Sequence, residues 1–167
     1  MIWFQVDAKP GGFVSHKEAD TLLIYHAIPA SRCNPTDSGL VLFSLDTDVL
    51  ILVIANYDTL LKDTYMSMVS ESLQINPIWT TFGSDRHKAL PAFHAFTGSN
   101  SSGRFARIGK VSWLNIYLKS DHSILSALPM LSQTSEVTKD QLSDLARFLC
   151  AAYLPKGVQI DNILKLR

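Results

Sequence analysis

The segment Gly39–Val53, which reads GLVLFSLDTDVLILV, constrains the fold more than any other stretch of the chain. Its apolar run Leu40–Leu45 has the length and the Val, Leu and Phe content of a buried parallel strand. Asp46 and Asp48 follow two residues apart, so both side chains leave the same face while the backbone stays extended. Because open α/β sheets bind ligands at the carboxyl ends of their strands, we predict an α/β fold with a candidate site here.

Two interpretations of Asp46 and Asp48 are open at this point. Burying a charge without compensation is costly, and two converging carboxylates suit a hard divalent cation, Mg²⁺ or Mn²⁺. Alternatively, one of the two aspartates only caps the helix that begins near Val49. The two interpretations carry equal weight for this motif taken alone.

Strand-like segments come early in the chain and helical segments come late. The strand candidates are Ile2–Val6, Leu40–Leu45 and Leu73–Phe82, the last expected at the sheet edge because of Pro77. At 167 residues the chain is long enough for one domain with a helical appendage. We therefore predict part of an α/β sheet in residues 1–100 and a helical region in residues 101–167.

Three predicted helices have expected ends or expected inward faces. A first helix follows the capping-box pair Ser15 and Glu18 and is expected to end at Pro29. A second is expected after the turn at Gly109, and a third after the capping box of Thr138 and Gln141. The side chains expected to face inward are Val111, Leu114, Tyr117 and Leu118 in the second helix, and Leu142, Leu145, Ala146, Leu149, Ala152 and Tyr153 in the third.

Charge is balanced overall but unevenly distributed. Fifteen acidic and fifteen basic residues leave no net charge, so composition does not mark a nucleic-acid-binding protein. The segment Ser84–Lys119, however, holds six bases and one acid, a local charge of +5. This segregation fits a basic surface beside an acidic site, although basic stretches are more often ordinary solvated faces.

Cysteine content and hydropathy indicate an intracellular protein without a membrane segment. Two cysteines, Cys33 and Cys150, are too few for a disulfide framework and lack the spacing of metal ligands. The longest apolar run is interrupted by the aspartates and falls short of the roughly 20 residues that a membrane span needs. The first residues lack the pattern of a signal peptide.

Three acidic or polar motifs occur in a recognisable order: Glu18-Ala19-Asp20, Asp46-Thr47-Asp48 and Thr97-Gly98-Ser99-Asn100. In this order they resemble the flap-endonuclease-like branch of the PIN-domain nucleases. The segments HKEADT, SLDTDVLIL, ALPAFHAFTGSN and RFARIGK look most like uncharacterised animal proteins of mobile-element origin that carry this domain. The resemblance covers roughly residues 15–156 and implies a PIN-like α/β/α core followed by a helical region.

The resemblance implies hydrolysis of phosphodiester bonds in branched or flap-like DNA by two Mg²⁺ or Mn²⁺ ions, and hence a nuclear location. Glu18, Asp20, Asp46 and Asp48 match the family's catalytic, metal-binding acids, and Asn100 stands at a further metal-binding position. Clustered carboxylates offset the charge of two cations that must also hold an anionic phosphate. Residues 101–119 match the family's helix–turn–helix element.

The helix–turn–helix match assigns the DNA phosphate contacts. These would come from Arg104, Arg107, Gly109 and Lys110. Such contacts position the duplex without reading its sequence.

The chain departs from the family pattern in ways that predict impaired or absent catalysis. Asn100 replaces an aspartate, only 17 residues precede Glu18, and Arg107-Ile108-Gly109 stands where the family has a glycine pair. We therefore expect a sheet that lacks its first strand and needs a protein partner or self-association to cover it. The alternative is a catalytically degenerate remnant that binds nucleic acid or protein.

Overall fold

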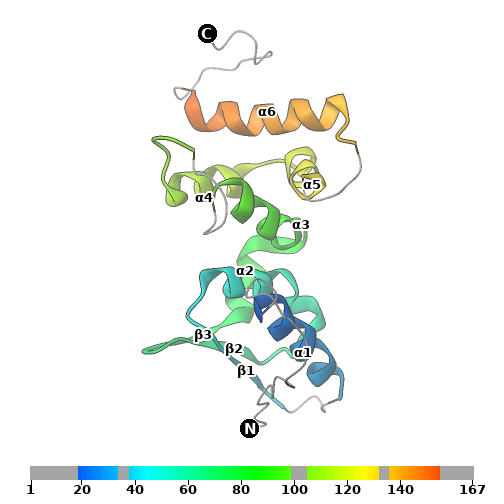
Figure 1. Cartoon of the computed structure of the whole chain (residues 1–167), viewed down its shortest axis with the longest axis vertical. Coiled ribbons are helices and arrows are strands. Elements are labelled where there is room, and N and C mark those ends of the chain that lie inside the picture. The colour runs from blue at the N-terminus through cyan, green and yellow to red at the C-terminus, as the bar shows by residue number, and fades with distance from the viewer. Residues whose placement is uncertain (1–18, 34–37, 99–104, 132–135, 155–167) are drawn as a thin grey trace. The chain divides into compact units, whose positions relative to one another are not determined.

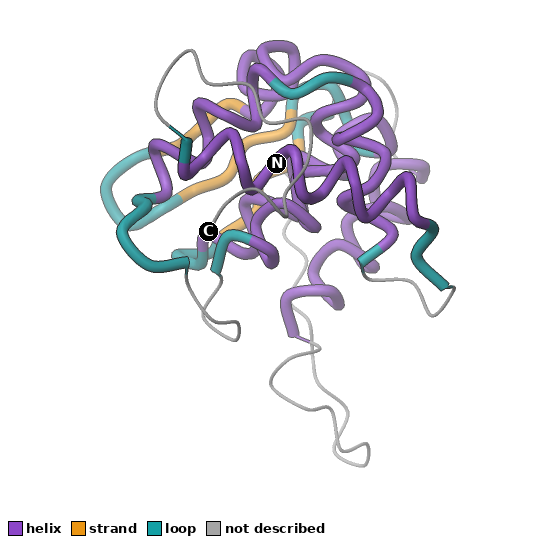
Figure 2. The backbone as a smooth tube through the Cα atoms, turned by 90° about the horizontal axis from the view of Figure 1, so that it is seen from above, coloured by secondary structure: helices purple, strands orange, loops and turns teal. Residues whose placement is uncertain are grey.

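A computed structural model describes residues 19–33, 38–98, 105–131 and 136–154. The described chain is α/β, with a small sheet and mostly helical content, which confirms the predicted class (Figure 2). The chain divides into two compact units, Met1–Gly83 and Ser84–Arg167. The boundary that we expected after residue 100 therefore falls inside the second unit.

The first unit holds all strands of the described chain and two α-helices beside them (Figure 1). A long helix, α3 (Ile75–Phe96), begins in this unit and continues into the second. The remaining elements of the first unit, in chain order, are α1 (Ala19–Cys33), β1 (Leu40–Phe43), α2 (Thr47–Ala55), the 3₁₀ helix η1 (Tyr57–Thr59), β2 (Thr64–Ser67) and β3 (Ser72–Gln74).

The sheet is three-stranded and mixed, in the order β1-β2-β3. β1 pairs with β2 in parallel, with Leu40 opposite Thr64, and β2 pairs with β3 in antiparallel fashion, with Met66 opposite Leu73. Leu40, Leu42, Thr64 and Met66 alternate along their strands and are buried on one face. The prediction of a parallel strand is thus confirmed for Leu40–Phe43.

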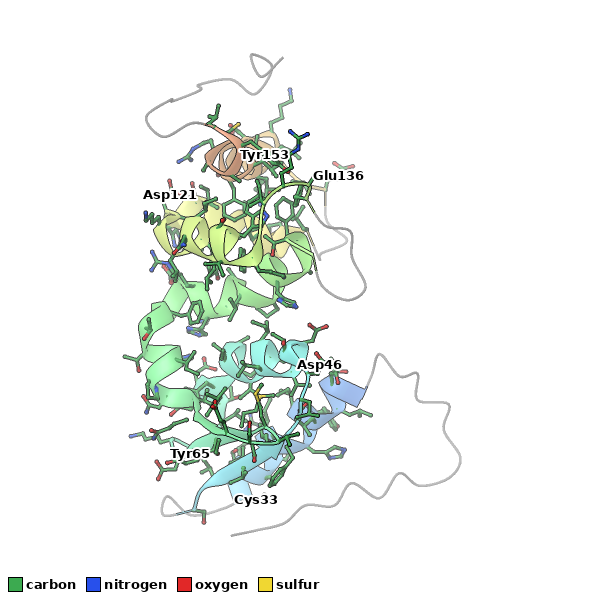
Figure 3. All side chains as sticks on the ribbon, turned by 90° about the vertical axis from the view of Figure 1, so that its left-hand side faces the viewer. Cys33, Asp46, Tyr65, Asp121, Glu136 and Tyr153 are labelled. Carbon is green, nitrogen blue, oxygen red and sulfur yellow. The ribbon has the colours of Figure 1, made fainter. Side chains whose placement is uncertain are left out.

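α1 and α2 pack against each other beside the sheet (Figures 1 and 3). Ile24 and Ala27 of α1 and Val49 and Val53 of α2 are buried, so the apolar face of each helix is covered. This packing positions the first turns of both helices, where the predicted acids lie.

Two predictions about helix boundaries in the first unit are wrong. α1 continues through Pro29 to Cys33. Pro29 cannot donate the helical hydrogen bond to the carbonyl group four residues earlier, at Tyr25. Because Tyr25 is 70% exposed, this loss falls on the exposed side of the helix. The predicted strand Leu73–Phe82 ends at Gln74, and α3 begins at Ile75. Pro77 falls in the first turn of that helix, where its missing N–H has no intrahelical partner to lose. The strand candidate Ile2–Val6 lies outside the described residues.

The described residues of the second unit form helices joined by turns, with no strand among them. It contains residues 84–96 of α3, then α4 (Lys110–Lys119), α5 (His122–Met130) and α6 (Lys139–Tyr153). The capping box of α6 is confirmed: the Gln141 amide donates to the Thr138 hydroxyl at 3.3 Å, and the Thr138 amide donates to the Gln141 side chain at 2.9 Å. α6 packs on both α4 and α5.

Aromatic side chains form the core of the second unit. Trp113, Tyr117 and Phe148 are almost completely buried. The Phe93 ring stacks on Tyr117 with centroids 4.2 Å apart, and the Trp113 ring lies 5.3 Å from Phe148. Rings of this size dominate burial, so they decide which helix face turns inward.

The predicted inward faces of α4 and α6 are only partly correct. Tyr117 and Leu145 are buried as predicted, but Val111 is 74% exposed and Leu142 is 55% exposed. Each helix instead turns its own large rings inward: Trp113 and Tyr117 on α4, and Phe148 on α6. These rings bury more apolar area than an aliphatic stripe would. Among the described residues, no helix is both long and apolar enough to cross a membrane.

Candidate acidic site and basic turn

Asp46 is the N-cap of α2. Its backbone is extended (φ −86°, ψ 127°), and its Oδ1 accepts a hydrogen bond of 2.9 Å from the amide of Asp48. Its own amide donates to the Ser44 hydroxyl at 3.1 Å. The capping interpretation is therefore confirmed for Asp46. Capping occupies one of the two carboxylate oxygens and fixes the orientation of the group.

Asp20 lies in the first turn of α1 and feels the charges of both aspartates of α2. Its pKa is raised, first by partial burial and then by the negative charges of Asp46 and Asp48. Figure 3 labels Asp46 at the start of α2, near the beginning of α1. The packing of α1 on α2 thus brings together three of the four acids that the sequence singled out.

Both helices offer positive backbone ends to this acidic site. Asp20 and Asp48 lie in first turns, where the positive end of the helix dipole favours carboxylates. This local stabilisation explains how the fold tolerates three acids that repel one another. It does not require a bound cation.

The structure describes three of the five candidate metal ligands, Asp20, Asp46 and Asp48. Within the described ranges, no group of three or more His, Cys, Asp or Glu side chains is arranged to hold a metal ion. Glu18 and Asn100 lie outside these ranges. The sequence assigns both of them to the same candidate Mg²⁺ or Mn²⁺ site as Asp20, Asp46 and Asp48.

The basic turn is the segment Phe105–Gly109 in front of α4. Arg107 has φ 67°, and it is the one residue other than glycine in the described chain with positive φ. Gly109 has an ordinary φ of −80° and is the N-cap of α4, without a side-chain hydrogen bond to the helix. The left-handed position of the turn is therefore at Arg107. Arg104 lies outside the described residues.

Lys110 holds the turn against the end of α3. Its ammonium group lies 3.3 Å from the His94 carbonyl oxygen, 3.3 Å from His94 Nδ1 and 3.3 Å from the Thr97 hydroxyl. A cation at the carboxyl end of a helix is stabilised by the helix dipole. Lys110 therefore has a structural role besides any contact with a ligand.

Side chains from α3, α4 and α6 support the turn. The Tyr153 hydroxyl donates to the Ala106 carbonyl at 3.2 Å, across 47 residues of sequence. The Phe105 ring lies 5.2 Å from the Phe96 ring and 5.3 Å from Trp113. Contacts over such distances in sequence leave no local spacing by which they could be predicted.

The exposed side of the turn is positively charged. The first turn of α4 contains no acid, and the side chains of Arg107 and Lys110 are exposed. The positive end of the helix dipole at the start of α4 adds to this charge. The turn is therefore chemically suited to an anionic group such as a phosphate.

No family model, curated protein or solved structure matches the chain. The resemblance to the flap-endonuclease-like nucleases consequently rests on the sequence motifs.

Proposed function

We propose that this chain is an endonuclease-like domain of the PIN type, dependent on divalent metal ions and acting on branched or flap-like DNA, with a weakened catalytic site. One observation carries the proposal. α1 packs on α2, and the pKa of Asp20 is raised first by partial burial and then by the charges of Asp46 and Asp48, so two motifs from different helices lie within reach of each other's charge. Capping of α2 explains the position of Asp46. It does not explain why Asp20, an acid of a second helix, lies within reach of that charge.

The residues have distinct roles in this proposal. Asp20, Asp46 and Asp48, with Glu18, would hold Mg²⁺ or Mn²⁺, which when bound lowers the pKa of the attacking water and stabilises the developing oxyanion. The cap of Asp46 on α2 keeps one carboxylate oxygen in a fixed place. Asp20 contributes negative charge from a second helix. A bound cation would stabilise the ionised form of this carboxylate, so Asp20 would bind the cation instead of a proton.

Positioning of the DNA is the role of the basic turn and the start of α4, which would form part of a helix–turn–helix-type element. Arg107 and Lys110 supply positive charge, Gly109 leaves the helix start open, and Arg104 belongs to the same basic run. These contacts bind phosphate, so they hold a duplex without selecting its sequence. A DNA substrate implies action in the nucleus.

Catalysis is expected to be weak. Asn100 supplies a carbonyl oxygen where the family has a carboxylate, so one negative charge is missing. Beside a divalent cation that charge is worth on the order of a few kcal/mol at an effective dielectric constant near 20. If the transition state loses this much, the rate falls by about a hundredfold or more.

A second candidate function is a remnant that binds DNA but no longer cuts it. The use of Asp46 as the N-cap of α2 favours this candidate, because it gives that carboxylate a role that needs no metal. A protein partner or a second copy covering the sheet would fit either candidate.

A cleavage assay on flap-bearing DNA with Mn²⁺ separates the two candidates. We expect Asn100→Asp to cut about a hundredfold faster than the natural sequence, and Asp48→Asn added to it to remove the gain. Asp58→Asn, which alters an exposed acid of η1, is the matched control. Binding without cleavage in Asn100→Asp would support the remnant. A chain that neither binds nor cuts DNA would contradict both.

A further inference from the structure

We infer that Gly83 is a hinge between the two units of the chain. The helix α3 runs from Ile75 to Phe96, but its backbone is not helical at Gly83, which has φ 74° and ψ 173°. The chain passes from the first compact unit to the second at the same place, between Gly83 and Ser84. The break in the helix and the division of the fold therefore coincide.

The conformation of Gly83 depends on its lack of a side chain. Backbone angles near φ 74° and ψ 173° are populated almost only by glycine. A Cβ atom added at Gly83 would meet no atom within 4 Å, whereas one added at Gly39 would lie 3.3 Å from the Asp63 carbonyl oxygen. Glycine is therefore required at position 83 for its backbone freedom and not for space.

Each half of α3 is fastened to its own unit. In the first unit the Trp79 ring lies 5.4 Å from the Tyr57 ring of η1. In the second, the Tyr117 hydroxyl donates a hydrogen bond to the Arg86 carbonyl oxygen, and Leu90 is almost completely buried. Because both flanking helices are held in this way, a change of angle is confined to the φ and ψ of the glycine between them.

The hinge links the two candidate sites, and this step alone rests on the proposed function. The acidic site belongs to the first unit, through Asp20 and Asp46, and the basic turn belongs to the second, through Arg107. A DNA molecule that engages both would fix the angle at Gly83. Binding would then select one conformation from a range that the free chain samples.

Distance measurements between two spin labels test the hinge. One label is placed on the exposed Cys33 of the first unit, and the other on Lys139→Cys at the start of α6, with the buried Cys150 replaced by alanine. We expect a broad distance distribution in the parent protein, loss of the broad component in Gly83→Ala, and further broadening when a second glycine is inserted after position 83. Gly109→Ala, at an open position with an ordinary φ, is the matched control.

Two results would overturn the inference. One is a single narrow distance in the parent protein. The other is a distribution that neither Gly83→Ala nor the inserted glycine changes, in variants whose circular dichroism shows both units folded. Flap-bearing DNA is then added to the labelled parent protein. If it leaves the distribution broad while the glycine variants act as expected, the hinge stands and DNA does not fix its angle, and the cleavage assay decides the proposed function separately.

Discussion

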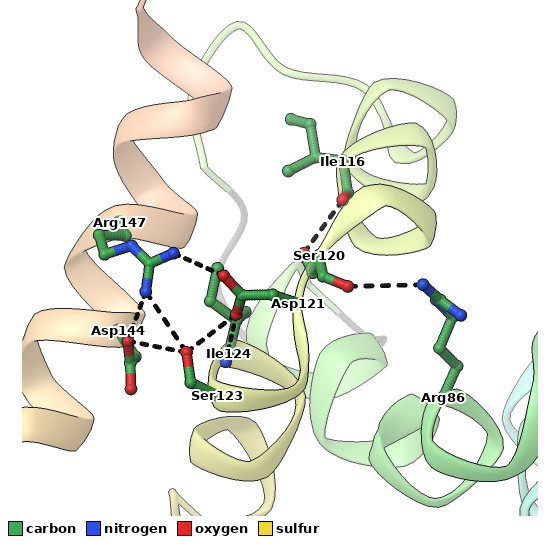
Figure 4. A network of polar contacts seen from close by, with 8 residues as sticks. All are labelled: Arg86, Ile116, Ser120, Asp121, Ser123, Ile124, Asp144 and Arg147. Carbon is green, nitrogen blue, oxygen red and sulfur yellow. Dashed lines mark hydrogen bonds and ion pairs between the residues drawn. The ribbon is translucent and has the colours of Figure 1, made fainter. Parts of the chain in front are cut away.

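Arg147 of α6 donates to the carboxylate that caps α5, with Nη2 of Arg147 lying 2.6 Å from Oδ2 of Asp121 (Figure 4). The other oxygen of Asp121 accepts hydrogen bonds from the Ile124 amide at 3.1 Å and the Ser123 hydroxyl at 2.9 Å. Asp144 completes the network through Nη1 of Arg147 at 2.8 Å. One carboxylate therefore both begins α5 and ties it to α6.

We expect Asp121→Ala to lower the stability of the second unit by about 1 kcal/mol, because it removes the cap of α5. Asp121→Asn keeps a capping oxygen and loses only the ion pair, which is about half exposed and worth less than roughly 1 kcal/mol. Thermal unfolding followed by circular dichroism measures both variants. Equal losses in the two would show that the ion pair, and not the cap, carries the stability.

The same carboxylate predicts a dependence on acid. The pKa of Asp121 is lowered from 3.8 to about 2, first by the Ile124 amide, then by the Ser123 hydroxyl and Arg147. Because the folded pKa lies below the unfolded one, its contribution is complete above pH 3.8 and disappears as the pH falls through about 2. Acid titration of helicity should show this loss, and Asp121→Asn should lack it. Asp140→Asn, an exposed acid of α6, should keep it.

A divalent cation should stabilise the first unit if the acidic site binds one. Saturation with Mn²⁺ at about a hundred times its dissociation constant would add about 2.7 kcal/mol to the free energy of unfolding. Asp46→Asn combined with Asp48→Asn keeps an acceptor at the N-cap of α2, so it tests charge without removing the cap. We expect Mn²⁺ to raise the melting temperature of the parent protein and not of this variant. Equal shifts in both proteins would remove the argument for a metal site.

The sequence was most informative where local pattern and burial agree. The apolar run Leu40–Leu45 predicted the strand β1, and the aspartates that follow it offered a helix cap as one of two open interpretations, because a strand followed by a polar helix start is a local signal. β2 was missed, since Thr64–Ser67 reads TYMS and owes its burial to pairing with β1. The strand expected at Leu73–Phe82 was wrong because Pro77 is equally compatible with the first turn of a helix.

The candidate site also has features that local sequence does not predict. Spacing placed Asp46 and Asp48 together, but nothing local predicted that Asp20 lies within the reach of their charges, because that depends on how α1 packs on α2. Likewise, the glycine pattern of the turn did not show that Arg107 takes the left-handed conformation. Tertiary contacts decide both features, and periodicity contains no information about them.

The backbone strain at Arg107 predicts that two substitutions which remove the same charge differ in stability. A left-handed conformation costs an ordinary residue roughly 1–2 kcal/mol, while glycine adopts it freely but loses more entropy on folding. We therefore expect Arg107→Gly to be about 1 kcal/mol more stable than Arg107→Ala in chemical denaturation. Similar stabilities would mean that the turn is not left-handed at this position in solution.

DNA binding should respond to the charge of Arg107 and not to its backbone. Arg107→Gly and Arg107→Ala should weaken binding alike, for every DNA sequence, and each should reduce the slope of log affinity against log salt by about one. Arg107→Lys, which keeps the charge, should retain the slope. Because Lys110 already bonds to the end of α3, its replacement should lower stability as well as affinity. Unchanged affinity in the Arg107 variants would show that the turn is not a phosphate contact, whatever their stabilities.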